Sequence, residues 1–272
     1  MTWKNVRILI FVFYSITAFI GCEPMAQNPE WKLVWNDEFD YQGMPDESKW
    51  NYATIGNPYD WGNNELQYYT ADRDSNAIVD GEHLIIKAYH EEYQNREYTS
   101  TRLTTKGKGD WRYGRIEVMA KLPGGRGTWP AIWMLPTDNQ YGGWPKSGEI
   151  DIMEHVGHDP DSIHTTVHTE AFNHIKGTQK GEATSLSDAE TAYHLYAIEW
   201  SEDGIDFFID KDKVFTFENT GNGPEEWPFD QPFHLILNIA IGGSWGGQQG
   251  VDNTIFPVEM EVDYVRVYQR IR

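Results

Sequence analysis

Three carboxylates stand within six positions of the stretch GEIDIMEHVG. Glu149 and Asp151 are two apart, which is the spacing of neighbours on one face of a β-strand, whereas Glu154 follows after three. A regular strand would turn Glu154 toward the core, where a lone carboxylate is costly. A one-residue β-bulge at Ile152 or Met153 removes this conflict, because the extra residue shifts the phase of the strand. The sequence therefore predicts a bulged strand with all three acids on one face.

Acids that crowd one face repel each other, so at least one of them should keep its proton near neutral pH. A proton donor beside an ionised carboxylate is the arrangement that cleaves glycosidic bonds. A retaining glycosidase needs two carboxyl groups roughly 5–5.5 Å apart, one as nucleophile and one as acid and then base. Asp151 stands between the two glutamates and can hydrogen-bond the nucleophile. Two other interpretations stay open at this point, a solvated acidic strand face and a calcium site.

The elements that must position these acids read as strands. Alternating or β-branched and aromatic-rich stretches are separated by turn signals such as Asp-Gly at 80–81 and 203–204. So many strands at short spacing need two packed sheets, so we predict an all-β sandwich formed by one domain over 29–272. The best helical candidate is SLSDAETAYH at 185–194. The predicted strands are KLVWNDEF, HLIIKAYHE, YGRIEVMAKL, IHTTVHTE, YHLYAIEWS, IDFFIDKDKVFTF, FHLILNIAIGG and VEMEVDYVRVYQ.

One of these stretches, HTTVHTE, carries polar side chains on a regular rhythm. His164, Thr166 and His168 share one face of the predicted strand. A ligand groove on a curved sheet would show this pattern, and so would a solvated sheet face.

Composition narrows the class of partner. The formal net charge is −20, so the surface repels polyanions, which argues against nucleic acid. The same repulsion favours a neutral polysaccharide over a heavily sulfated one. The 12 tryptophans exceed what a core of this size needs, so some should line a surface or cleft, where indole faces stack on sugars.

The N-terminus has the pattern of an export signal. Lys4 and Arg7 precede a short apolar run that ends at a small residue before Cys22, the single cysteine of the chain. The apolar run is too short to span a bilayer as a helix. We predict a signal peptide at 1–21 and a polar tether at 22–28. The ending resembles the lipobox of bacterial lipoproteins, so Cys22 is expected to be lipid-anchored at the cell envelope; an ordinary secretory leader is the alternative.

The acid motif also carries a family resemblance. GEIDIMEHVG matches the E-x-D-x-x-E signature of the laminarinase-like branch of glycoside hydrolase family 16. Four further stretches, in family order, look similar to this family over about 29–270: WNDEFDYQGMPDESKWNY, NNELQYYTADRDSNAIVDGEHLIIKA, YGRIEVMAKLPGGRGTWPAIWMLP and EVDYVRVYQ.

The resemblance implies a monomeric jelly-roll enzyme that hydrolyses β-1,3-glucan such as laminarin, without a catalytic cofactor. It makes Glu149 the nucleophile, Asp151 its assistant and Glu154 the acid/base. Three alternatives remain: a galactanase of the agarase or porphyranase type, a transglycosylase with the same acids, and a glucan-binding protein without catalysis. The last usually lacks the catalytic glutamates, and the unbulged lichenase branch is disfavoured by the spacing to Glu154.

The resemblance also implies a set of sugar-binding positions. Several of them keep a plain structural interpretation: Trp133 as packing, the two loop residues as capping groups and the histidine as an ordinary sheet residue. The positions are Trp129, Trp133, Asn64, Glu65, His168 and Trp245.

A structural calcium ion is implied on the side away from the groove, held mostly by backbone carbonyls and one aspartate. The matching positions are Glu38, Gly81 and Asp263. Oxygen donors from three remote segments suit a hard cation.

Overall fold

The computed structural model describes residues 31–271, which form one compact unit. The predicted signal peptide, tether and Cys22 lie outside the described residues. Within 31–271 no helix is both long and apolar enough to cross a membrane. The helical content of these described residues is a short 3-10 segment, η1 (Asn57–Gly62), which lies between strands β3 (Asn51–Tyr52) and β4 (Gln67–Tyr69).

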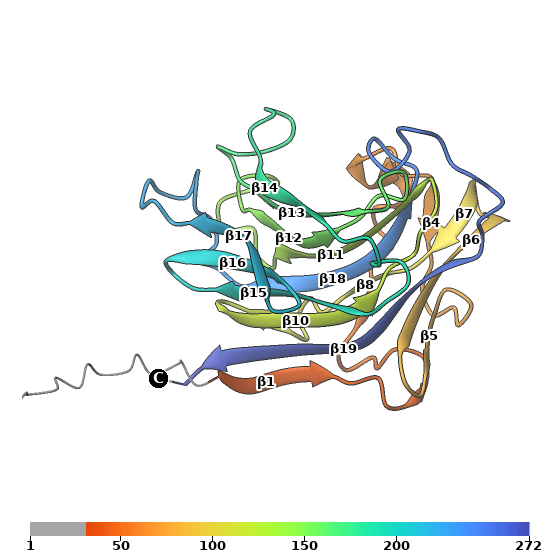
Figure 1. The fold of residues 1–272 in the computed structure, drawn as a ribbon, viewed down its shortest axis with the longest axis horizontal. Helices are drawn as coiled ribbons and strands as arrows, with labels where there is room; N and C mark the ends of the chain where they lie inside the picture. Colours follow the sequence, from red (N-terminus) through yellow and green to blue (C-terminus); the bar gives the residue numbers. More distant parts are fainter. Residues whose placement is uncertain (1–30, 272) are drawn as a thin grey trace, which may run out of the picture. The chain divides into compact units, whose positions relative to one another are not determined.

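Two sheets make up the fold, as predicted for an all-β sandwich, and their strands are antiparallel except for one parallel pair (Figure 1). The 8-stranded sheet has the order β14 (Lys180–Ser185), β13 (Ser162–His168), β12 (Glu149–Glu154), β11 (Thr128–Pro136), β18 (Phe233–Ile241), β8 (Arg102–Thr104), β3 (Asn51–Tyr52), with β9 (Asp110–Trp111) beside β18.

The 11-stranded sheet packs against it. Its order is β17 (Asp212–Glu218), β16 (Gly204–Ile209), β15 (His194–Trp200), β10 (Gly114–Lys121), β19 (Val258–Arg270), β6 (Leu84–Tyr93), β5 (Ala77–Asp80), β2 (Gln42–Gly43), with β1 (Trp31–Asp37) on β19, β7 (Arg96–Ser100) on β6 and β4 (Gln67–Tyr69) on β7.

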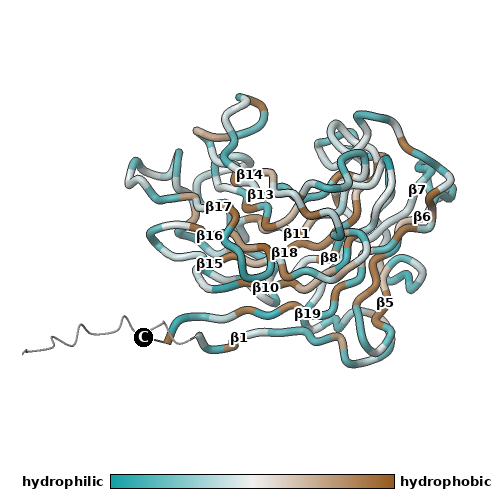
Figure 2. Tube along the Cα trace, viewed as in Figure 1, coloured by the Kyte–Doolittle hydropathy of each residue, from teal (hydrophilic) through white to brown (hydrophobic). Residues whose placement is uncertain are grey.

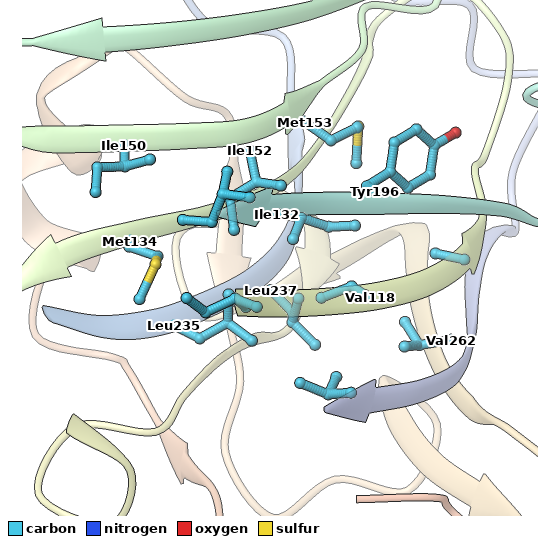
Figure 3. Packing of buried hydrophobic residues seen from close by; sticks show 14 of the residues in the cluster. Val118, Ile132, Met134, Ile150, Ile152, Met153, Tyr196, Leu235, Leu237 and Val262 are labelled. Atoms are coloured by element: carbon cyan, nitrogen blue, oxygen red, sulfur yellow. The ribbon is translucent and has the colours of Figure 1, made fainter. Parts of the chain in front are cut away.

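The core lies between the sheets. In Figure 1 the sheet with β11, β12 and β13 lies over the sheet with β10 and β15. Many strands are hydrophobic along their length and the loops between them are mostly hydrophilic (Figure 2). Side chains from both sheets meet in this layer, among them Ile150, Ile152 and Met153 from β12 and Val118 and Tyr196 from the facing sheet (Figure 3).

Two predictions about elements were wrong. The segment 185–194 is no helix: its ends are held in β14 and β15 of different sheets, and the short connection between them holds only a turn, in which the Asp188 carbonyl accepts two backbone hydrogen bonds. The stretch IDFFIDKDKVFTF is not one strand but the hairpin of β16 and β17, because Asp210 takes a left-handed conformation and turns the chain.

Candidate active site

The acid strand β12 carries the predicted bulge. Against β13, Asp151 pairs with Thr166 and Glu154 with His164, so three steps on β12 match two on its partner. Against β11 the register shifts at the same place. This is the geometry of a β-bulge, and it confirms the phase shift predicted from the spacing.

Core packing accounts for the bulge. Ile152 and Met153 are consecutive, yet both side chains are fully buried in the core between the sheets. A regular strand alternates its faces and cannot bury two neighbours on one side. The bulge therefore satisfies two apolar residues and at the same time returns Glu154 to the face of Glu149 and Asp151.

Each acid has a polar residue of β13 as its neighbour in the sheet. Glu149 pairs with His168, Asp151 with Thr166 and Glu154 with His164. The face predicted from HTTVHTE is thus the face that carries the acids. The Glu149 side chain is 16% exposed and that of Asp151 only 3%.

Burial sets the protonation of the three acids. It raises the pKa of Glu149 to about 8 and that of Glu154 to about 7, and it raises the pKa of Asp151 well above its usual range. Repulsion from Glu154 adds to the effect at Glu149. The Arg102 guanidinium and the Trp144 indole N–H act in the opposite direction there, because both stabilise a negative charge on Glu149. The cluster therefore retains protons near neutral pH.

His168 contacts two of the acids as a neutral ring. Its Nε2 lies 3.4 Å from Oδ2 of Asp151 and 3.8 Å from Oε1 of Glu149. Burial, and to a lesser degree the nearby His174, lowers the pKa of His168 to about 4, so these contacts are not ion pairs at neutral pH. A neutral imidazole can share protons with carboxyl groups without adding a charge to the site.

Aromatic side chains surround Glu154. The indole N–H of Trp129 donates a hydrogen bond of 3.0 Å to the carboxylate of Glu154, which lowers its pKa against the effect of burial. Trp245 packs edge-on against both Trp129 and His164, with ring centroids 5.6 and 4.8 Å apart. Trp245 is half-buried, and its glycine-rich loop is tied to Asn63 through the Ser244 N–H.

A positively charged side chain, that of Arg102 on β8, lies on the other side of the acid site. The Arg102 guanidinium lies over the rings of Trp61 and Trp133, with centroid distances of 4.5 and 4.6 Å. The Trp133 N–H donates a 2.7 Å hydrogen bond to Asn238. One face of Trp133 is therefore covered by protein, so its role combines packing with the lining of the groove.

Asn64 and Glu65 have different environments. Asn64 is exposed and lines a hollow of about 560 Å³ together with the loop that begins at Gly242. Glu65 is only 5% exposed, and its carboxylate accepts hydrogen bonds from Gln67, Asn63 and Tyr69. Its oxygens are directed into the protein, where they support the groove from below, and Asn64 is the member of the pair that is open to a ligand.

Comparison with known proteins identifies the family. A family model for glycosyl hydrolases family 16 matches residues 63–266. A curated relative, a β-glucanase of Rhodothermus marinus, is 54% identical over 268 residues, which is 94% of this chain and 93% of the relative. The chain belongs to glycosyl hydrolase family 16. The predicted family is thereby confirmed.

Solved structures of family 16 share the fold. The X-ray structure of the laminarinase from Rhodothermus marinus matches with a TM-score of 0.87 and 55% identity, covering 90% of this chain and 99% of that chain. A variant of SCLam, a non-specific endo-β-1,3(4)-glucanase co-crystallised with 1,3-β-D-cellotriosyl-glucose, matches with a TM-score of 0.86 and 49% identity, covering 91% and 98%. The predicted jelly-roll sandwich is confirmed.

The three predicted calcium positions of this family 16 chain lie on or next to strands of the 11-stranded sheet. Glu38 comes directly after Asp37, the last residue of β1, which pairs with Val265 of β19. Gly81 lies in the turn between β5 and β6, and Asp263 is the extra residue of a bulge in β19. The Glu38 carboxylate is held by Arg266, with hydrogen bonds of 2.9 and 2.7 Å, so its backbone carbonyl is the oxygen left for a cation. Two carbonyls and one carboxylate fit a hard cation such as calcium.

Among residues 31–271 one cluster of histidine and acidic side chains could also hold a metal ion. Ligand atoms of Glu149, Asp151 and His168 lie within 4.8 Å of one another. These three groups are the buried members of the acid cluster and its histidine neighbour on β13.

Sequence reasoning missed several residues of this family 16 site. Arg102 stands alone in STRLTT, and no period or motif distinguishes it from a surface arginine. Trp144 had a usable signal, since a tryptophan between glycines and a proline, five residues before Glu149, is poorly placed for a core. His174 and Asn238 gave no such signal.

Proposed function

We propose that the protein is a retaining endo-1,3-β-glucanase that hydrolyses β-1,3-glucan such as laminarin. The observation that carries the proposal is the bulged strand β12, which presents Glu149, Asp151 and Glu154 on the groove face beside tryptophans. The laminarinase and β-glucanase relatives support this activity over nearly the full chain. The groove and the negative surface suit a neutral polymer.

Glu149 is the nucleophile in this proposal. Its carboxylate attacks the anomeric carbon while Glu154 protonates the departing glycosidic oxygen, which gives a covalent glycosyl-enzyme. Water then attacks the same carbon as Glu154 takes up its proton. The reactive state has one proton on Glu154 and none on Glu149. Arg102 and the Trp144 N–H favour it because they stabilise charge on Glu149.

Asp151 and His168 hold the nucleophile. Asp151 is buried beside Glu149, and its raised pKa leaves it protonated, so it can donate a hydrogen bond to an ionised neighbour. Neutral His168 stands within 4 Å of both side chains and limits their movement. Trp129 fixes Glu154 and offers its ring to the sugar, with Trp245 packed behind it.

A reducing-sugar assay on laminarin, lichenan, agarose and porphyran tests the function. We expect the highest rate on laminarin and a lower rate on lichenan, a mixed-linkage glucan, because the SCLam relative is described as acting on both linkages. We expect no rate on agarose or porphyran. Preferential cleavage of a galactan would overturn the proposed substrate.

The location of the protein is a separate proposal. The leader and Cys22 support export and a lipid anchor at the bacterial cell envelope. One acyl chain alone holds weakly, so stable attachment needs more than one chain. The native protein should partition with membranes after export and a Cys22→Ala variant should not. Equal solubility of both forms would leave simple secretion.

A calcium ion bound through Glu38, Gly81 and Asp263 is proposed as well. It would join the end of β1, the β5–β6 turn and the β19 bulge, and so brace the sheet opposite the groove. Its contribution would be to stability.

A further inference from the structure

Three side chains from separate segments gather on the β13 side of Glu149. His168 is on β13, Trp144 is in the loop between β11 and β12, and His174 is in the loop between β13 and β14. The ring centroids of Trp144 and His174 are 5.0 Å apart, those of His168 and His174 5.2 Å, and those of Trp144 and His168 6.0 Å. The cluster is continuous with the acid site.

The three side chains of the cluster differ in solvent exposure. His168 is buried next to the acids, while Trp144 is 39% exposed and His174 is exposed. Desolvation lowers the pKa of both histidines, so the cluster is neutral at neutral pH. A neutral surface of indole and imidazole rings suits the apolar faces and hydroxyl groups of a neutral sugar.

The loop that carries Trp144 is fixed by hydrogen bonds. The hydroxyl of Ser147 donates to the carbonyl of Gly142 and accepts from the Tyr141 N–H. The side chain of Gln231 donates to the Ser147 carbonyl, which ties the loop to the chain before β18. The exposed tryptophan is therefore presented by a rigid loop.

The loop that carries His174 is fixed in a similar way. The buried Asn173 side chain donates to the carbonyls of Thr169 and Glu170 and accepts from the Lys176 N–H. Both loops together form a preorganised surface, which loses little entropy when a ligand binds.

The opposite flank of Glu149 has another character. Toward β8 the groove is built by Trp133, Arg102 and the network below them around buried Glu65. In a retaining reaction the glycosyl part stays on the enzyme through both steps, whereas the leaving part must depart and give way to water. The deep flank suits the part that is retained, and the open flank suits the part that leaves.

We propose that Trp144 and His174 bind the sugar unit on the leaving-group side of the scissile bond. The same surface receives the acceptor when a sugar, and not water, attacks the glycosyl-enzyme. The inference rests on the proposed function and adds to it the residues that select the leaving group.

The test compares two substrates that differ only on the leaving-group side. Laminaritetraose places a sugar there, whereas β-laminaribiosyl fluoride places only a fluorine atom. With the fluoride, the C1–F bond breaks, the bond from C1 to Glu149 forms and fluoride departs, so no sugar is needed at the open flank. The native enzyme is measured first on both.

His174→Ala is the decisive variant because the ring of His174 packs on Trp144 and His168 and, within residues 31–271, forms no hydrogen bond or ion pair with the acids. We expect kcat/KM on laminaritetraose to fall about fivefold to tenfold, as for the loss of one stacked ring. We expect no fall on the fluoride, and a lower ratio of transfer to hydrolysis when laminaribiose is added. The matched control is Ile175→Ala, the next residue, which is 74% exposed and should change neither substrate.

Trp144→Phe provides a second pattern. It keeps a ring for the sugar but removes the N–H that stabilises charge on Glu149, so it should lower the rate on both substrates and shift the pH profile. A similar loss on both substrates for His174→Ala, or no loss on either, would overturn the inference. A native enzyme that cleaves neither substrate would instead refute the proposed function.

Discussion

At the scale of single residues, the site depends on how the environment divides one set of acids into different roles. Glu149 and Glu154 are chemically identical, and both have a raised pKa through burial. Their partners differ: Arg102 and Trp144 stabilise charge at Glu149, while Trp129 donates a hydrogen bond to Glu154. Burial and repulsion from Glu154 still leave the pKa of Glu149, at about 8, above that of Glu154, at about 7, so the proposed roles use the less populated state in which the single proton is on Glu154.

Azide distinguishes the roles of the two glutamates. With a good aryl leaving group, Glu154→Gln should still form the glycosyl-enzyme and then stall for lack of a base. Azide needs no base, so it should rescue this variant and give the β-glycosyl azide. Glu149→Ala should instead give the α-azide by direct attack. Product NMR decides, and exchanged anomers would reverse the assignment.

The pH profile tests the shared protons. At a pH below the pKa values of the Glu149–Glu154 pair, Glu149 is protonated and cannot attack. At a pH above them, Glu154 has no proton to donate. The profile of kcat/KM on laminarin should therefore be bell-shaped, with its alkaline limb between about pH 7 and 8. A limb near the ordinary pKa of glutamic acid would contradict the raised values.

Trp129→Phe should move the alkaline limb of that profile to higher pH. The lost N–H lowers the pKa of Glu154 in the native protein, so its removal lets this pKa rise. Trp245→Phe serves as the control, because Trp245 packs on Trp129 and does not bond to Glu154. Equal shifts in both variants would point to a general loosening of the aromatic cluster.

At the scale of elements, β12 is the decisive strand. It lies between β11 and β13, and its bulge is fixed from the core side by Ile152 and Met153. The position of Glu154 over the groove is therefore set by apolar packing beneath it. The bulge in β12 therefore affects both the stability of the core and the activity of the site.

Deletion of Met153 should restore regular alternation and give E-I-D-I-E. We expect a folded protein with strongly reduced activity on laminarin, because the acid/base would reach the scissile bond at another height. Met153→Ala is the matched control: it keeps the bulge, should retain most activity, and should lose about 2–5 kcal/mol of unfolding free energy. Activity and thermal unfolding are measured for both variants, and an active deletion variant would refute the role of the bulge.

At the scale of the whole molecule, the sandwich separates its functions between two faces. The 8-stranded sheet carries the acids, and the far sheet carries the proposed calcium positions around Asp263. A net charge of −20 disfavours polyanions and favours bound cations across the whole surface.

Chelation tests the calcium proposal. Removing a cation present at 100 times its Kd costs about 2.7 kcal/mol, which is about 5–10 °C in Tm for a domain of this size. Calcium should restore the Tm and magnesium should not, and an Asp263→Ala variant should start low and not respond. The rate on laminarin at 25 °C should change little. An unchanged native Tm after chelation would remove the site.

The sequence by itself determined the local features of the protein. The alternation of strands predicts the sandwich, and the spacing of three acids predicts the bulge, because side-chain direction in a strand follows from position alone. The resemblance over 29–270 gave the family and the acid roles. The prediction of a helix at 185–194 was wrong because the two ends of this segment belong to strands of different sheets, and the local sequence pattern does not indicate strand pairing.

Only the tertiary structure decided which residues surround the acids. Arg102 is 47 residues from Glu149 along the chain, and His174 is 25 residues from it. No sequence periodicity links these positions, and the order of the strands brings the two residues to opposite sides of Glu149. Glu65 was expected to bind sugar, with loop capping as the alternative, and it proved buried, with its oxygens accepting hydrogen bonds from Gln67 and Tyr69. Burial and long-range pairing depend on packing between distant segments, and these set the pKa values on which the proposed chemistry rests.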